Sequence, residues 1–179
     1  MLTVRVPSRN SALTPALTAF TERKELSPFR AGACHEDAII EKPAYCKDGQ
    51  FTVKGKIDLA YRDRDRVSVI DWKIGDDNGA EDSLQLLSYA MLAMSHFICT
   101  PDSLDLYRVH LGGFKVVHFR VSEADILRTR GRILQDLGRM QALEHYGRNA
   151  IVEAFTPCRQ ARICALCPYQ GVCPKEYQP

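Results

Sequence analysis

Long apolar runs are missing from this sequence of 179 residues, and so is a strong excess of charge of either sign. No run approaches the ~20 apolar residues that a membrane-spanning helix requires, so we expect no membrane partner. The N-terminal stretch MLTVRVPSRN lacks the basic-then-apolar order of a secretory signal, which predicts a cytoplasmic protein. The net charge of +2 permits a polyanionic partner without arguing for one, so any basic surface has to be local.

Internal repeats and low-complexity tracts are also missing. The apolar fraction of 45% and the charged fraction of 26% are ordinary for a globular protein, and the length suits one domain with a small appendage. From Phe155 onward the sequence is rich in Cys, Pro and Arg, and it is too short and polar to build a core. We therefore predict a core over residues 1–154 and a separate tail over residues 155–179.

Cysteines are present, but in a pattern that does not suit disulfides. Their number, seven, is odd, and the expected compartment is reducing. Four of them lie between Cys158 and Cys173, and Cys164, Cys167 and Cys173 form a C-x2-C-x5-C pattern. Thiolates at this spacing can converge on one centre, so the tail is predicted to bind zinc or an iron–sulfur cluster.

An alternating strand pattern, VSVIDWK, precedes the first candidate site. Because strand side chains alternate, Asp71 and Lys73 share one face and Trp72 lies on the other. A second strand pattern at 51–61 and the charged, turn-like segment at 61–66 predict an antiparallel hairpin. If the turn is centred between residues 64 and 65, Asp58 lies directly across from Asp71.

Two carboxylates placed opposite each other on a sheet repel, so this pairing needs an explanation. A divalent cation such as magnesium, which takes oxygen ligands, would supply it. Asp58, Asp71 and the carbonyl of Trp72 would then bind the metal, and Lys73 would orient a water or stabilise developing negative charge. The alternative is a surface hairpin with two solvated aspartates and a lysine.

The remaining pattern predicts helices and strands in alternation. The segment HEDAIIE at 35–41 could close a helix or open a strand, and three prolines in the first 30 residues break any long helix. Gln85 and Tyr89 share one face of the helix at 81–94. The expected elements are a short helix at 16–25, strands at 51–61 and 67–73, a helix at 81–94, strands at 104–110 and 114–120 joined at Gly112-Gly113, and a long helix from the Ser122–Asp125 capping box to about residue 146.

The order of four motifs resembles the PD-(D/E)xK nuclease superfamily. The motifs are Glu41, G-x-I-D at 55–58, V-I-D-W-K-I-G at 69–75 and Q-L-L-S-Y at 85–89. More narrowly, they resemble the RecB-like branch that includes the AddB nuclease domain and CRISPR-associated RecB-like exonucleases. The resemblance implies an α/β fold with a mixed central sheet flanked by helices, as in restriction endonucleases, followed here by the cysteine-rich metal-binding tail.

The same resemblance implies a deoxyribonuclease of exonuclease type that requires Mg²⁺ or Mn²⁺. Asp58 and Asp71 would be metal ligands, Lys73 the catalytic lysine, and Gln85 and Tyr89 would support the site and the DNA backbone. DNA is the implied partner, with a helicase or another recombination, repair or defence protein beside it. The competing hypothesis is a catalytically silent module that binds DNA ends or docks to a partner in a larger complex.

Two further sets of ligands follow from the resemblance. Members of this branch carry a metal-binding histidine upstream, where this chain offers only His35, which is either that ligand or a helix-end residue; Glu41 either contacts the metal or begins a strand. The family also ends in a C-x2-C-x5-C pattern that binds a 4Fe–4S cluster with one distant cysteine. Cys34 or Cys158 would be the fourth ligand here, and we favour Cys158 because it is local; zinc is the alternative to the cluster.

Overall fold

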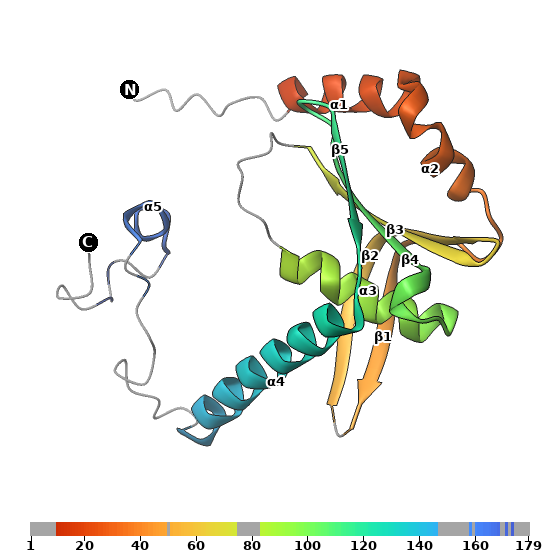
Figure 1. Ribbon diagram of the computed structural model, residues 1–179. Helices are drawn as coiled ribbons and strands as arrows, with labels where there is room; N and C mark the ends of the chain where they lie inside the picture. Colours follow the sequence, from red (N-terminus) through yellow and green to blue (C-terminus); the bar gives the residue numbers. More distant parts are fainter. Residues whose placement is uncertain are drawn as a thin grey trace, which may run out of the picture. The chain divides into compact units, whose positions relative to one another are not determined.

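The computed structural model describes residues 10–49, 51–74, 83–146 and, near the C-terminus, 158, 160–168, 171 and 173. By contacts the chain divides into two compact units, Met1–Arg130 and Gly131–Pro179. The predicted boundary between residues 154 and 155 lies outside the described residues. The helical and strand segments, labelled in Figure 1 where there is room, are α1 (Asn10–Glu22), η1 (Lys24–Leu26), α2 (Ser27–Gly32), β1 (Ile39–Asp48), β2 (Phe51–Asp63), β3 (Arg66–Lys73), α3 (Ser83–Phe97), η2 (Pro101–Ser103), β4 (Leu104–His110), β5 (Lys115–Arg120), α4 (Glu123–Tyr146) and α5 (Ala161–Cys164).

Five strands form one mixed sheet in the order β1-β2-β3-β4-β5. The β3–β4 pair is parallel and is connected through α3, whereas the other neighbouring pairs are antiparallel. A parallel pair needs such a crossover, because a tight turn can join only antiparallel strands. The mixed sheet and its flanking helices confirm the α/β part of the predicted fold class.

The β2–β3 hairpin has the predicted register. Asp63 pairs with Arg66, so the turn is centred between residues 64 and 65, and the ladder runs to the Leu59–Ile70 pair. Arg64 in the turn has a φ of 54°, a backbone conformation typical of tight hairpins. Asp58 and Asp71 are the next residues on the two strands, just beyond the last pair of the ladder.

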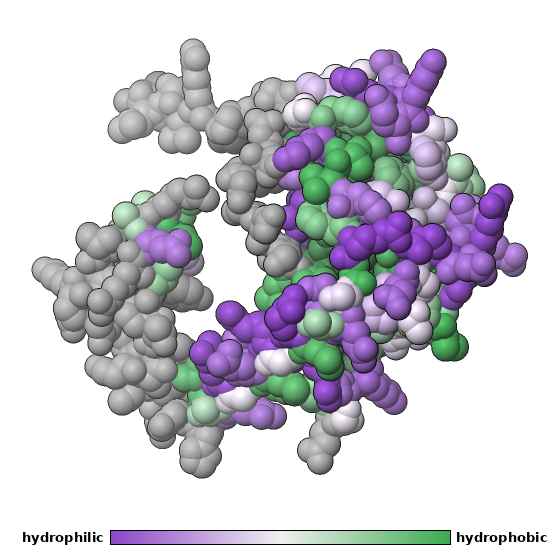
Figure 2. Space-filling view, viewed as in Figure 1, coloured by the Kyte–Doolittle hydropathy of each residue, from purple (hydrophilic) through white to green (hydrophobic). Residues whose placement is uncertain are grey.

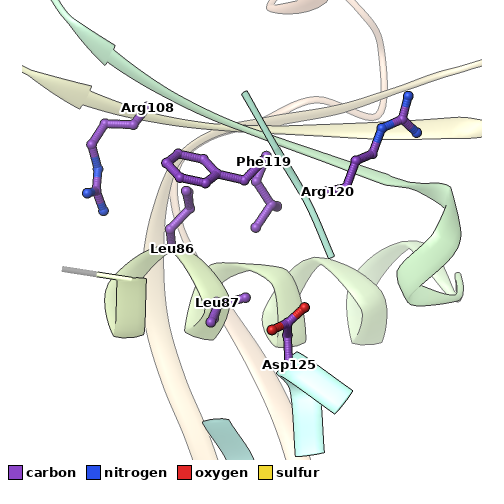
Figure 3. A pocket seen from close by; sticks show the side chains of 7 residues that line it. Leu86, Leu87, Arg108, Phe119, Arg120 and Asp125 are labelled. Carbon is purple, nitrogen blue, oxygen red and sulfur yellow. The ribbon is translucent and has the colours of Figure 1, made fainter. Parts of the chain in front are cut away.

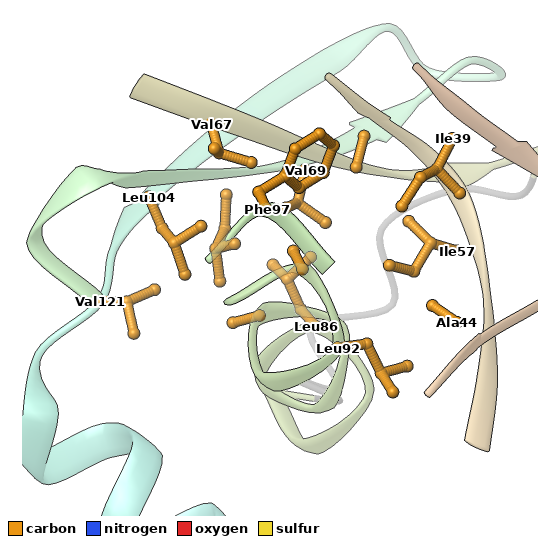
Figure 4. Packing of buried hydrophobic residues seen from close by; sticks show 14 residues of the cluster. Ile39, Ala44, Ile57, Val67, Val69, Leu86, Leu92, Phe97, Leu104 and Val121 are labelled. Atoms are coloured by element: carbon orange, nitrogen blue, oxygen red, sulfur yellow. The ribbon is translucent and has the colours of Figure 1, made fainter. Parts of the chain in front are cut away.

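Two apolar clusters lie on the two faces of the sheet. One joins the sheet to α3 and is shown in Figure 4. The other contains Leu59 and Ile70 from the sheet together with Ala16 and Phe29 from α1 and α2. Neighbouring residues of β3, such as Val69 and Ile70, belong to opposite clusters, as strand alternation requires. The face with α3 is the one that also carries Asp71 and Lys73.

Glycine in the G-x-I-D motif permits close packing of α3 on β2. A Cβ built at Gly55 would lie 2.5 Å from Cδ1 of Leu92, which is fully buried. A side chain there would push α3 away from the sheet. The glycine thus brings the helix that carries Gln85 and Tyr89 down onto the strand that carries Asp58.

The N-terminal region differs from the expectation. α1 begins at Asn10 and continues through Pro15, although the prolines were expected to break any long helix and the short helix was expected to begin only at Ala16. The helix persists because Ala16 and Phe20, which follow the proline, pack into the cluster beneath it. Burial of that apolar face offsets the hydrogen bond that Pro15 cannot donate. The segment at 35–41 opens strand β1, which begins at Ile39.

The start of α4 has the predicted capping box. The backbone N–H of Ser122 donates to Oδ2 of Asp125 over 2.9 Å, and the Asp125 N–H donates to Oγ of Ser122 over 3.2 Å. Two backbone donors at the helix start are thereby satisfied.

The surface is mixed in polarity. Figure 2 shows many hydrophilic side chains on one face of the molecule, with smaller apolar areas among them. Within the described ranges, no helix has the length and apolar character needed to cross a membrane.

Candidate active site

The candidate site lies where β2 separates from β3. Residues 59–63 of β2 pair with β3, whereas residues 51–57 pair with β1 alone. Figure 1 shows β1 and β2 running on past the other strands. At this fork the Trp72 N–H donates to Oδ2 of Asp58 over 2.9 Å, so the carboxylate takes the place of a backbone carbonyl. Asp58 is thus held in the plane of the sheet, beside β3.

Asp71 is completely buried at the same fork. Its Oδ2 accepts a hydrogen bond from Nε of Arg108 over 3.2 Å, and the Lys73 ammonium lies 2.9 Å from its Oδ1. Oδ1 makes no hydrogen bond with any described group, so the contact with Lys73 is an ion pair without hydrogen-bond geometry. Oδ1 thus has a charged neighbour but no hydrogen bond, so its lone pairs could bind a cation if the Lys73 ammonium moved aside.

A chain of hydrogen bonds through α3 connects Lys73, the ion-pair partner of Asp71, with Asp58. The Lys73 ammonium donates to Oε1 of Gln85 over 2.8 Å, and Nε2 of Gln85 donates to the Tyr89 hydroxyl over 3.1 Å. The Tyr89 hydroxyl in turn donates to Oδ1 of Asp58 over 3.5 Å. Lys73 has only protons to give, so it fixes which end of the Gln85 amide faces it and hence the direction of the whole chain.

The electrostatics of the fork follow from burial and from like charges. Burial raises the pKa of Asp58, the Trp72 N–H opposes this, and the charges of Asp71 and Glu41 raise it further, so that it ends above the ordinary value. Burial also raises the pKa of Tyr89, with the aspartates adding to the effect, so its hydroxyl stays a proton donor. A cation bound between the carboxylates would relieve their repulsion.

The donor set at the fork fits a magnesium or manganese ion. The N–H and C=O of one strand residue point to the same side, so the Trp72 carbonyl faces β2 as its N–H does. The site therefore offers Oδ1 of Asp71, the Asp58 carboxylate and this carbonyl. Among the described residues, no three His, Cys, Asp or Glu side chains are grouped to hold a metal. Two carboxylates suffice for Mg²⁺, which retains several water ligands.

Glu41, on the neighbouring strand β1, lies next to this donor set. It falls between the Ile40–Leu59 and Lys42–Ile57 pairs, directly opposite Asp58. Its φ is 50°, unusual for a residue with a side chain inside a strand, and its carboxylate pairs with Lys56. The structure thus brings Glu41 beside Asp58, with its carboxylate engaged by a lysine.

The strain at Glu41 marks a slip in side-chain alternation. Ile39 and Ala44, five positions apart, both belong to the cluster under α3, and so do Ile57 and Ala60 on β2. Residues an odd number apart normally face opposite ways, so each strand shifts by one position in between. Asp58 sits at the shift, which explains why its carboxylate can lie toward β3 rather than toward a helix.

His35 is not brought to the fork. Its Nδ1 lies 2.9 Å from the carbonyl oxygen of Arg62, and its ring packs against Tyr61. Arg62 is four residues beyond Asp58, or about 13 Å along the strand. The structure therefore gives His35 the alternative role that the sequence left open, that of a residue at a helix end.

Arg108 is a site residue that the sequence pattern does not reveal. It pairs with Asp71 across the parallel β3–β4 ladder and is 7% exposed. The strand pattern of β4 places it on the same face as Leu104 and Leu106, where an apolar residue is the usual choice. The one sequence signal for Arg108 is a charged residue on the buried face of a strand. Its partner can be identified only when the neighbouring strand is known.

The C-terminal cysteines form a separate candidate site. All seven cysteines of the chain are free thiols. Burial raises the pKa of Cys164, and the nearby thiols of Cys158, Cys167 and Cys173 raise it further. Cys164 Sγ also lies 3.0 Å from the Cys158 carbonyl oxygen. These four cysteines are near enough to interact, but no metal-binding arrangement is formed among the described residues, so the metal-binding tail stays a prediction.

Comparisons with known proteins assign the chain to a family. The model of the PD-(D/E)XK nuclease superfamily matches residues 7–174. No curated protein matches the sequence. Among solved structures, "Crystal structure of SSO0001" is similar with a TM-score of 0.47 and 17% identity, over 93% of this chain and 71% of that one, and at this level it adds nothing to the assignment. Because the family model spans nearly the whole sequence, the chain belongs to the PD-(D/E)xK nuclease superfamily.

Proposed function

We propose that this protein is a metal-dependent DNA nuclease that hydrolyses phosphodiester bonds at the fork, of the RecB-like exonuclease type. One observation carries the proposal: Oδ1 of the fully buried Asp71 makes no hydrogen bond with a described group and lies across from a second carboxylate, Asp58. Neighbouring carboxylates cost stability in a sheet. A divalent cation would relieve their repulsion and would use the lone pairs of Oδ1, which has an ion pair with Lys73 but no hydrogen bond.

Asp58, Asp71 and the Trp72 carbonyl would hold Mg²⁺ or Mn²⁺, with Glu41 adjacent. When bound, such an ion polarises a phosphoryl oxygen and lowers the pKa of a bound water. Asp58 is kept in position by the Trp72 N–H and by Tyr89, and Asp71 by Arg108. The protein thus fixes both carboxylates before any substrate arrives.

Lys73 supplies the mobile positive charge. Its side chain is 34% exposed, so its ammonium reaches solvent while it contacts Asp71 and Gln85. From there it can hold the attacking water or a non-bridging oxygen of the phosphate as negative charge develops. Gln85 limits the swing of the ammonium, which keeps it aimed at the fork.

We further propose that Cys158, Cys164, Cys167 and Cys173 bind a structural 4Fe–4S cluster. The electrostatic influence of the other three thiols on Cys164 supports a common centre. A cluster would stabilise a segment too short and polar to form a core. Anaerobically purified protein is expected to be brown and to lose its visible absorption in Cys167→Ser but not in Cys99→Ser. Colourless protein that contains zinc would favour the zinc alternative.

The nuclease activity is tested on the full-length protein with single- and double-stranded DNA, with Mg²⁺, with Mn²⁺ and with EDTA. Cleavage should require the metal, and Asp71→Asn and Lys73→Met should each lower its rate more than about 100-fold. Asp63→Asn is the matched control, because this exposed aspartate lies at the turn end of the same hairpin. Folded variants that cut DNA as fast as the parent would refute the proposal. DNA binding without cleavage under any condition would favour the silent binding module.

A further inference from the structure

A small pocket lies beside the fork, between α3 and strands β4 and β5. Its volume is about 220 Å³. Figure 3 shows Phe119 and Leu86 close together, with Arg108 toward one end and Arg120 and Asp125 toward the other. The pocket is lined by Leu86, Leu87, Leu106, Arg108, Phe119, Arg120 and Asp125.

The pocket and the fork share residues and neighbours. Arg108 lines the pocket and also donates to Asp71, 3.2 Å away. Leu86 follows Gln85, which receives the hydrogen bond from Lys73. A group bound in the pocket is therefore separated from Asp71 by a single arginine side chain.

The size and chemistry of the pocket fit one heterocyclic base. Pockets for drug-sized ligands range from about 300 to 1,000 Å³, so this one is too small for a whole dinucleotide. Its walls are apolar, and Phe119 offers an aromatic ring of the kind on which bases stack. Arg108 and Asp125 lie at its two ends, where the edges of a base carry polar atoms; Arg108 also donates to Asp71, and Asp125 also accepts from Ser122 and Arg128. Arg120 forms an ion pair with Asp105 over 3.5 Å, but its side chain is 66% exposed, so its positive charge also reaches solvent where a neighbouring phosphate would lie.

We propose that this pocket receives one unpaired base of the DNA strand that is cut at Asp58 and Asp71, an inference that rests on the proposed nuclease function. A base within a duplex is paired and stacked, and it would have to leave the stack to enter. The pocket therefore selects DNA whose bases are unpaired near the cleaved phosphate, such as a single strand or a frayed end.

Equilibrium binding in EDTA tests the pocket without cleavage. Short single-stranded oligonucleotides are compared with versions that carry one abasic residue, moved along the strand. For the parent protein, loss of one particular base is expected to weaken binding about tenfold to a hundredfold, the effect of losing one stacked base. Leu87→Trp, which fills the pocket from α3, should bind the intact strand as weakly as the parent binds that abasic strand, and base loss should then change nothing.

Two further variants separate base binding from general damage. Phe119→Ala removes the aromatic wall without filling the pocket and should also reduce the effect of base loss. Leu127→Trp is the matched control, since Leu127 is 57% exposed and does not line the pocket. Circular dichroism and thermal unfolding establish that each variant is folded.

The outcomes distinguish the two proposals. If the protein cuts DNA but no single base affects binding, or if Leu87→Trp leaves the abasic effect unchanged, the base pocket is refuted and the nuclease proposal stands. If the parent neither cuts nor binds DNA of any form, both proposals fail. A base effect that disappears in Leu87→Trp and Phe119→Ala but persists in Leu127→Trp supports the pocket.

Discussion

Replacing Arg108 with methionine should destabilise the folded protein through Asp71. The guanidinium is 7% exposed and donates to a carboxylate that is 0% exposed, so its loss leaves a buried charge with one partner fewer. Hydrogen bonds to charged groups contribute about 1.5–3 kcal/mol, and removing the sole partner of a buried ion costs about 3–5 kcal/mol. Because Lys73 remains 2.9 Å from Asp71, we expect a loss of about 2–3 kcal/mol.

This loss is measured by denaturant unfolding and by calorimetry. For a chain of this length it corresponds to a fall in Tm of about 4–12 °C. Arg128→Met is the matched control, since that arginine forms an ion pair on an exposed helix and should cost less than about 1 kcal/mol. The double variant Arg108→Met/Asp71→Asn also removes the buried charge. Its loss of stability should therefore be smaller than the sum of the two single losses by at least about 1 kcal/mol. An unchanged Tm in Arg108→Met, or additive effects in the cycle, would refute the reasoning.

Two further predictions concern packing and pH. Gly32→Ala should lower the free energy of unfolding by about 1–3 kcal/mol, because a Cβ there would lie 2.2 Å from Cε1 and Cζ of Tyr61. Asp105 should contribute stability that is lost in acid: burial raises its pKa, but hydrogen bonds from Arg66 and His118 outweigh this and hold the pKa below its ordinary value. The contribution is complete above the unfolded-state pKa of about 3.9 and disappears as the pH falls through the lower folded-state pKa. Asp105→Asn should therefore lose less stability than the parent between pH 5 and pH 2, measured by urea unfolding.

Each of these two predictions has an outcome that would contradict it. Gly131→Ala, where a Cβ meets nothing within 4 Å, should stabilise α4 by about 0.5–1 kcal/mol, so equal destabilisation by both alanines would contradict the role of Tyr61. If Asp105→Asn and the parent lose the same stability between pH 5 and pH 2, Asp105 does not carry the pH dependence.

Much of the fork could be predicted because its geometry is local. Strand alternation places Asp71 and Lys73 on one face, and a short hairpin fixes Asp58 opposite Asp71 once the turn is located. Helical spacing then gives Gln85 and Tyr89 a common face, and a close-packed Gly55 brings their helix onto the strand. Each of these steps involves residues separated by at most one element.

The contributions that the sequence did not reveal are non-local. Arg108 reaches Asp71 only because β4 lies parallel to β3, a pairing that depends on the crossover through α3 and has no signature in β4 itself. α1 continues through Pro15 because tertiary burial outweighs a local propensity. His35 is the only histidine upstream of the candidate site, but the fold places its ring against the Arg62 carbonyl, near the turn of the hairpin.

The one-position slip at Glu41 and Asp58 has a consequence for how this sheet can vary. On the turn side of the slip, β1 and β2 form a two-stranded ribbon whose inward-facing residues are set independently of those nearer the hairpin with β3. Residues can therefore be added to or removed from the ribbon tip in pairs without changing which residues face the metal ligands. The slip thus separates a ribbon tip whose length can vary from the rest of the sheet, whose geometry must be kept because Gly55 there holds α3 close to the strand that carries Asp58.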